Sequence, residues 1–202
     1  MRVLKEPEER RNEILDAAYE LFFEKGYDNT SVLDILEKVG IAKGTLYYYF
    51  KSKEDIMDAI IERIIAKMLS KANAIVLDDS LSVHEKLLRT LMSLHLNEEK
   101  GQMVMDHIHN PQNARLHKKQ LDAITHGVTP ILTLILEEGI AQGLFSTPFP
   151  YESAEMLLIY SEMTFDHPEG NIARKIAAFI CNMERILGAE KNSFSYMTQL
   201  FN

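Results

Sequence analysis

A short stretch of the sequence combines lysines, tyrosines and a glycine without any carboxylate. Residues 38–53 contain four lysines and three consecutive tyrosines, and they contain no Asp or Glu. Lysine ammonium groups neutralise phosphate charge, and tyrosine and threonine hydroxyls can hydrogen-bond to phosphate oxygens. A glycine lets the backbone approach a nucleic acid closely, and a threonine methyl group can contact thymine. The stretch therefore has the chemistry of a surface that holds DNA mainly through its phosphates.

The same stretch also has a plainer interpretation. Consecutive aromatic residues such as Tyr47, Tyr48 and Tyr49 beside Phe50 often belong to a hydrophobic core. A group of lysines is often no more than a solvated face. The elements on either side of the stretch must therefore decide between a core and a binding surface.

Two short helices are expected to position these residues. Ser31 with Asp34 has the spacing of a capping box, which predicts the start of a helix, and Gly40 is expected to end it. A third helix is expected from about Lys43 to Tyr49. Two short helices joined by a glycine-containing turn match the helix-turn-helix plan, in which the second helix enters the major groove of DNA.

Helical spacing divides the residues of this third helix between two sides. Leu46 and Phe50 lie one turn apart and are expected to face the neighbouring helices. The outward residues are then Gly44, Thr45 and Tyr48, with Lys43, Tyr47 and Tyr49 on the flanks. The N-terminus of the helix that begins near Ser31 adds backbone N–H groups for one more phosphate. A long amphipathic helix from Pro7 to Lys25 would brace the pair from behind.

An ordered signature in this region resembles the N-terminal part of the tetracycline-repressor (TetR) family. The signature comprises residues 14–18, Leu21-Phe22, Lys25-Gly26-Tyr27, Thr30-Ser31 and the continuous run 39–54. The resemblance implies an all-helical homodimer with a three-helix DNA-binding head, residues 1–54, and a helical effector-binding and dimerisation domain, residues 55–202. One departure is Ala42, where a capping serine is common. The alanine lacks that side-chain cap, which is worth about 1 kcal/mol.

The resemblance also carries DNA contacts over to individual positions. It favours Tyr47 and Tyr49, whereas helical spacing alone selects Tyr48, so all three tyrosines are retained. The predicted DNA-binding residues are Thr30, Ser31, Lys43, Gly44, Thr45, Tyr47, Tyr48, Tyr49 and Lys53.

The rest of the chain has helical periodicity, and we expect no strands, so the fold class is all-α. His107 and His109 could not share one ion from a regular helix, because residues two apart point about 200° from each other. We therefore expect no metal site, no cofactor and no enzymatic activity. Two interpretations of the histidines stay open: they are polar groups inside an apolar effector cavity, or core residues whose hydrogen bonds are made within the protein. The methionines either line a pocket or fill the core. The candidate effector-binding residues are His95, Met103, His107 and Tyr160.

Two segments, residues 151–166 and 169–187, are apolar over wider arcs than one buried face requires. By position and resemblance they should pair with their copies across a two-fold axis, and ordinary packing within one chain is the alternative. Two recognition helices would then lie about 34–36 Å apart on a palindromic operator. A small-molecule effector that favours another spacing would release the DNA.

Composition limits the remaining possibilities. A net charge of −8 argues against a general nucleic-acid binder. Most of the excess of acidic over basic residues lies in residues 54–202, however, with 13 basic against 20 acidic residues. One cysteine, no signal-peptide pattern and no apolar run of bilayer length favour a cytoplasmic protein that does not associate with membranes. The rival hypotheses are a DNA-binding dimer without an effector and a metal-assisted enzyme.

Overall fold

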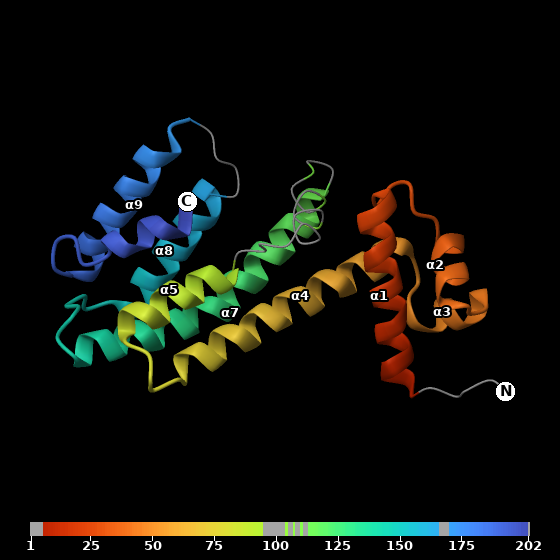
Figure 1. Cartoon of the computed structure of the whole chain (residues 1–202), viewed down its shortest axis with the longest axis horizontal. Helices are drawn as coiled ribbons and strands as arrows, with labels where there is room; N and C mark the ends of the chain where they lie inside the picture. Colours follow the sequence, from red (N-terminus) through yellow and green to blue (C-terminus); the bar gives the residue numbers. More distant parts are fainter. Residues whose placement is uncertain are drawn as a thin grey trace. The chain divides into compact units, whose positions relative to one another are not determined.

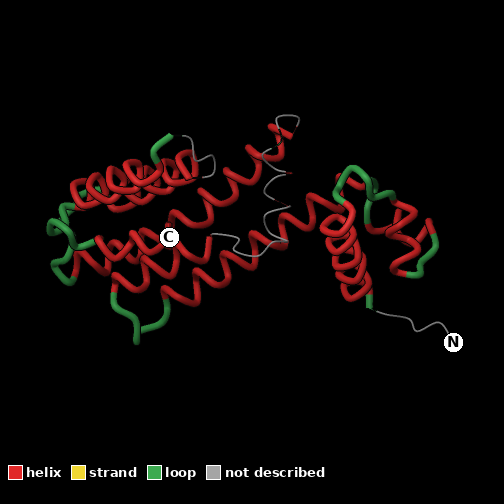
Figure 2. The backbone as a smooth tube through the Cα atoms, turned by 45° about the horizontal axis from the view of Figure 1, so that its top comes forward, coloured by secondary structure: helices red, strands yellow, loops and turns green. Residues whose placement is uncertain are grey.

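The computed structural model describes residues 6–94, 104, 107, 110, 113–165 and 170–201. Within these ranges the elements are helices joined by turns, and no strand occurs, as Figure 2 shows. The all-α prediction is confirmed. The helices labelled in Figure 1 are α1 (Pro7–Lys25), α2 (Val32–Val39), α3 (Lys43–Tyr49), α4 (Lys53–Val76), α5 (Val83–Leu94), α7 (Ala114–Ala141), α8 (Pro150–Phe165) and α9 (Ile172–Leu187). A 3-10 helix, η2 (Ser195–Phe201), follows them.

The chain divides into two compact units. The N-terminal unit contains residues 1–66 and 96–120, and the second unit contains residues 67–95 and 121–202. The division at residue 54, drawn from the family resemblance, stays a prediction, because compactness alone does not show which residues make up a DNA-binding domain. None of the described helices is both long enough and apolar enough to span a bilayer.

Local sequence signals explain where the first helices begin and end. Pro7 occupies the first turn of α1, where its missing N–H costs nothing. The Ser31 hydroxyl accepts from the Asp34 N–H at 3.1 Å, and the Asp34 carboxylate accepts from the Ser31 N–H at 2.8 Å, which confirms the predicted capping box. Gly40, with φ 72°, ends α2 in the left-handed conformation that favours glycine.

A single apolar core joins the helices of the N-terminal unit. The α1 face supplies the largest share, and its spacing of three and four residues turns these side chains to one side. Its fully or nearly fully buried apolar residues include Ile14, Leu15, Ala18, Leu21, Phe22, Ile35, Leu46, Phe50, Ile56, Met57, Ile60 and Ile61. Burying each large side chain contributes about 1.5–3 kcal/mol, so this core fixes the orientation of the short helix α3.

The second unit packs α5, α8, α9 and η2 together with the C-terminal part of α7 (Figure 1). A buried ion pair joins two of these helices, since Lys86 Nζ on α5 lies 2.7 Å from a carboxylate oxygen of Glu138 on α7. Gly139 lies against the Phe145 ring, and a methyl group there would overlap it. The helix α7 continues through Pro130, which stands inside it.

Candidate nucleic-acid interface and apolar cavity

The short helix α3 carries an exposed aromatic and basic surface. Tyr47 and Tyr48 are 44% and 78% exposed, and Lys43 is also exposed. The Lys43 Nζ lies 5.7 Å from the centre of the Tyr47 ring, and the rings of Tyr48 and Tyr49 meet edge to face at 5.0 Å. The run of tyrosines therefore lies at the surface, with Tyr49 half-buried, while Phe50 enters the core.

The backbone of α3 is accessible at its first turn. A Cβ atom placed on Gly44 would find none of the described atoms within 4 Å. Ala42 stands at the N-cap position, where no described side chain caps the helix. The first turn of α3 therefore has no side-chain cap, and Thr45, whose N–H donates to the Ala42 carbonyl at 2.9 Å, is half-buried there. These residues form the recognition surface, which we define as Lys43, Gly44, Thr45, Tyr47, Tyr48 and Tyr49.

Ser31 lies at the surface at the start of α2, but its hydroxyl is already engaged. It donates to the Asp34 carboxylate at 2.5 Å, and that carboxylate also accepts from Lys25 Nζ at 2.6 Å. Lys25 and Ser31 together hold the pKa of the Asp34 carboxyl well below its usual range. A phosphate at this helix end would have to compete with a carboxylate that is already charged.

Thr30 does not lie with the recognition surface. Its side chain is 1% exposed, and its hydroxyl lies 2.8 Å from the Gly26 carbonyl oxygen and 3.2 Å from that of Leu21. Its N–H donates to the Tyr27 carbonyl at 3.2 Å. The hydroxyl and the N–H of Thr30, a residue that the resemblance assigned to DNA, therefore stabilise the turn between α1 and α2.

Lys53 also holds this turn. Its Nζ donates to the carbonyl oxygens of Tyr27 at 2.8 Å and Thr30 at 3.0 Å, and it lies 4.2 Å from the centre of the Tyr27 ring. These contacts tie the first residue of α4 to the α1–α2 turn. The predicted phosphate contact would have to use the one ammonium donor that these two bonds leave over.

His107, a candidate effector residue, belongs to the N-terminal unit, and its role in effector binding stays a prediction. Its ring lies against Tyr27 with 4.1 Å between the ring centres, and Asn113 Nδ2 donates to its carbonyl oxygen at 2.8 Å. Burial lowers the pKa of His107. Tyr27 is therefore held between Lys53 and His107, a grouping that sequence spacing could not reveal.

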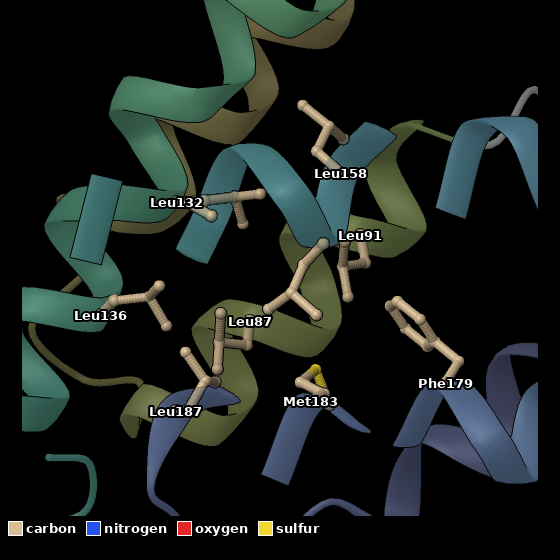
Figure 3. A pocket seen from close by; sticks show the side chains of 10 residues that line it. Leu87, Leu91, Leu132, Leu136, Leu158, Phe179, Met183 and Leu187 are labelled. Carbon is tan, nitrogen blue, oxygen red and sulfur yellow. The ribbon is translucent and has the colours of Figure 1, made fainter. Parts of the chain in front are cut away.

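An apolar cavity lies within the second unit, between α5, α7, α8 and α9 (Figure 3). Its volume is about 20 Å³, which is room for roughly one water-sized molecule. All the side chains that line it are apolar, and they are Leu87, Leu91, Leu132, Leu136, Ala154, Leu157, Leu158, Phe179, Met183 and Leu187.

Of the predicted effector residues, the two that the structure describes, His107 and Tyr160, are not among the residues that line this cavity. Tyr160 stacks on Phe179, with ring centres 5.9 Å apart, and is 43% exposed. His95 and Met103 lie outside the described residues. No three His, Cys, Asp or Glu side chains of the described ranges gather as a metal site would require. Sequence reasoning missed the lining leucines, because a leucine on an amphipathic helix predicts burial without saying what it encloses.

A three-helix unit that exposes a short polar recognition helix, joined to a helical unit with its own core, defines a helix-turn-helix DNA-binding regulator. Comparison with known proteins agrees. Residues 14–60 match the model of bacterial regulatory proteins of the tetR family, and residues 96–184 match a tetracyclin repressor-like C-terminal domain.

Individual relatives support the same assignment. The chain is 31% identical to the HTH-type transcriptional repressor KstR2 of Mycolicibacterium smegmatis, over 69% of each chain. It is 28% identical to the fatty acid metabolism regulator protein of Bacillus subtilis, over 69% of this chain and 73% of that one. A TetR/AcrR regulator from Thermobifida fusca superposes with a TM-score of 0.61 at 29% identity, over 89% and 96% of the two chains. The chain belongs to the TetR family and is a DNA-binding transcriptional regulator.

Proposed function

We propose that this protein is a homodimeric repressor that binds a palindromic operator and is released by a small apolar effector. It acts in the cytoplasm, needs no cofactor and catalyses no reaction. The observation that carries the proposal is the recognition surface, where a buried Leu46 fixes a helix that exposes Lys43, Tyr47 and Tyr48. A short helix with an uncapped first turn, a bare Gly44 and hydroxyl-bearing rings fits against phosphates at the edge of a major groove.

The second unit offers a surface for the two-fold contact. On α8, the apolar side chains of Met156, Ile159 and Tyr160 are 60%, 37% and 43% exposed. The exposed side of α9 carries small residues, among them Ala177 and Cys181, which allow a neighbouring helix to approach closely. Apolar side chains next to small ones support a helical interface between two copies.

The cavity supports an apolar effector. Side chains from four helices point toward one another around it (Figure 3), and each contributes carbon or sulfur atoms. Because its volume of about 20 Å³ is far below that of a drug-sized ligand, an effector must separate these helices as it enters. Such a change of packing is what couples one site to another in an allosteric protein.

The decisive experiment is selection of bound duplexes from a random DNA pool at two salt concentrations. The unmodified protein should enrich a palindrome, and a Lys43→Ala, Tyr47→Ala double variant should lose that enrichment. Lys67→Ala is the matched control, because Lys67 is an exposed lysine of α4 in the second unit. Enrichment of a single half-site with no symmetry would contradict the dimeric scheme.

Two further measurements separate the parts of the proposal. Light scattering of a Met156→Arg, Ile159→Arg variant should show a monomer if α8 forms the interface. A screen of apolar compounds by thermal unfolding should find ligands that stabilise the protein, by about 2.7 kcal/mol at 100 times the dissociation constant. A protein that binds its operator but responds to no compound would favour a regulator without an effector.

A further inference from the structure

One buried hydroxyl in the second unit has no partner. Thr129 on α7 is 0% exposed, and its Oγ1 makes no hydrogen bond to any of the described residues. Buried hydroxyls in native proteins are nearly always paired, so an unpaired one calls for an explanation. One explanation is a group that is bound only part of the time.

The position of Thr129 relates it to the cavity. At about 100° per residue, Thr129 lies roughly 60° from Leu132 and 20° from Leu136 around the axis of α7. Both leucines line the cavity, and both point into it in Figure 3. Thr129 therefore continues the cavity-lining face of α7 by one turn beyond Leu132.

We propose that the effector is an amphiphile, whose aliphatic part occupies the leucine-lined cavity as the helices separate and whose uncharged oxygen-bearing end hydrogen-bonds to Thr129. This inference rests on the proposed role of the cavity as the effector site. The aliphatic part follows from a lining made of leucines with Ala154, Phe179 and Met183. The polar end is uncharged, because a single hydroxyl can satisfy an alcohol, ester or amide but cannot offset the burial of a full charge.

Thr90 on α5 provides the comparison. It too is 0% exposed, and its Oγ1 likewise has no partner among the described residues. It lies about 40° around the helix axis from Lys86, whose ammonium pairs with Glu138, and about 60° from Leu87, which lines the cavity. Thr129 lies closer to the centre of its lining face, about 20° from Leu136, so the proposal assigns the contact to Thr129 and the test compares the two hydroxyls.

The test is titration calorimetry of the full-length protein, without DNA, with n-hexanol and n-hexyl fluoride. The two probes have chains of equal length, but fluorine is a poor hydrogen-bond acceptor and cannot donate. We expect the unmodified protein to bind the alcohol about tenfold more tightly, the effect of one buried hydrogen bond. Thr129→Val should abolish this preference and leave the affinity for the fluoride within about twofold, while Thr129→Ser and Thr90→Val should keep it.

Three outcomes would overturn the proposal. They are a preference that survives in Thr129→Val, a preference lost equally in Thr90→Val, and failure of the unmodified protein to bind either probe. Operator selection on the same preparation tests the proposed repressor function separately from the proposed effector. A protein that enriches its palindrome but binds neither probe refutes the amphiphile, whereas one that binds hexanol through Thr129 but enriches no DNA refutes the proposed repressor.

Discussion

Replacement of Lys53 by methionine distinguishes a lysine that holds the fold from one that holds DNA. Methionine keeps the aliphatic stem but removes the ammonium group, which bonds to the carbonyls of Tyr27 and Thr30 and lies 4.2 Å from the Tyr27 ring. Each hydrogen bond is worth about 1 kcal/mol net at this half-buried site, and the cation–π contact adds about 0.5–1 kcal/mol. Lys53→Met should therefore lower the free energy of unfolding by about 2–3 kcal/mol.

The measurement is thermal unfolding followed by circular dichroism, because the chain has no tryptophan for fluorescence. For a chain of this length the loss corresponds to a fall in Tm of about 4–12 °C. Lys51→Met and Lys43→Met are matched controls, since both lysines are exposed and lie in the same stretch. Both controls should unfold like the unmodified protein, and Lys43→Met should weaken DNA binding. A Lys53→Met protein as stable as the controls would refute the assignment of Lys53 to the α1–α2 turn.

Four other substitutions test local surroundings in the two units. Thr30→Val removes the buried hydroxyl that bonds to main-chain carbonyls, so urea unfolding should show a loss of about 1–2 kcal/mol, and an unchanged midpoint would contradict this role. Gly139→Ala forces a methyl group into the Phe145 ring and should cost about 1–3 kcal/mol, whereas Gly44→Ala, with open space around it, should stabilise the protein slightly while weakening DNA binding. Burial lowers the pKa of His107 below its ordinary 6.5, so the neutral imidazole is favoured in the folded state. As the pH falls below 6.5, the unfolded chain binds the proton more readily than the folded one, and the free energy of unfolding decreases. His107→Leu should reduce that acid-side loss, and an unchanged pH profile would count against it.

The parts of the fold that depend on neighbouring residues could be predicted from the sequence. The Ser31–Asp34 capping box and the stop at Gly40 involve atoms within a few residues of one another, and the structure has both. The outward side of α3 also followed from one rule, because a buried Leu46 fixes the direction of every other side chain on a seven-residue helix.

The roles of Thr30 and Lys53 could not be predicted in the same way. Lys53 reaches carbonyl oxygens 26 and 23 residues away, and such pairings depend on how α1 and α4 cross. A resemblance transfers a position, but it does not say whether the side chain there faces DNA or the protein. Thr30 is assigned to DNA by resemblance and is almost fully buried in the structure.

The residues that line the apolar cavity were the least predictable part. Polar and polarisable residues drew attention because their chemistry is conspicuous, and His107 proved to pack against Tyr27 in the N-terminal unit. The cavity is instead built from leucines of four helices, whose sequence pattern is that of any buried face. Thr129 gave no signal, since its significance comes from a hydrogen bond that is missing.

The small size of the cavity sets a concentration threshold for an effector at this site. About 20 Å³ of space is room for roughly one water-sized molecule, so an effector that enters this cavity, as proposed, needs a more open packing of the four helices. The apparent dissociation constant then equals the intrinsic one divided by the open fraction. A looser core, as in Leu136→Ala, would raise that fraction and make the regulator respond to less effector, at the expense of stability in its absence. Packing of leucines, and not contacts to the ligand alone, would then tune the sensitivity of the response.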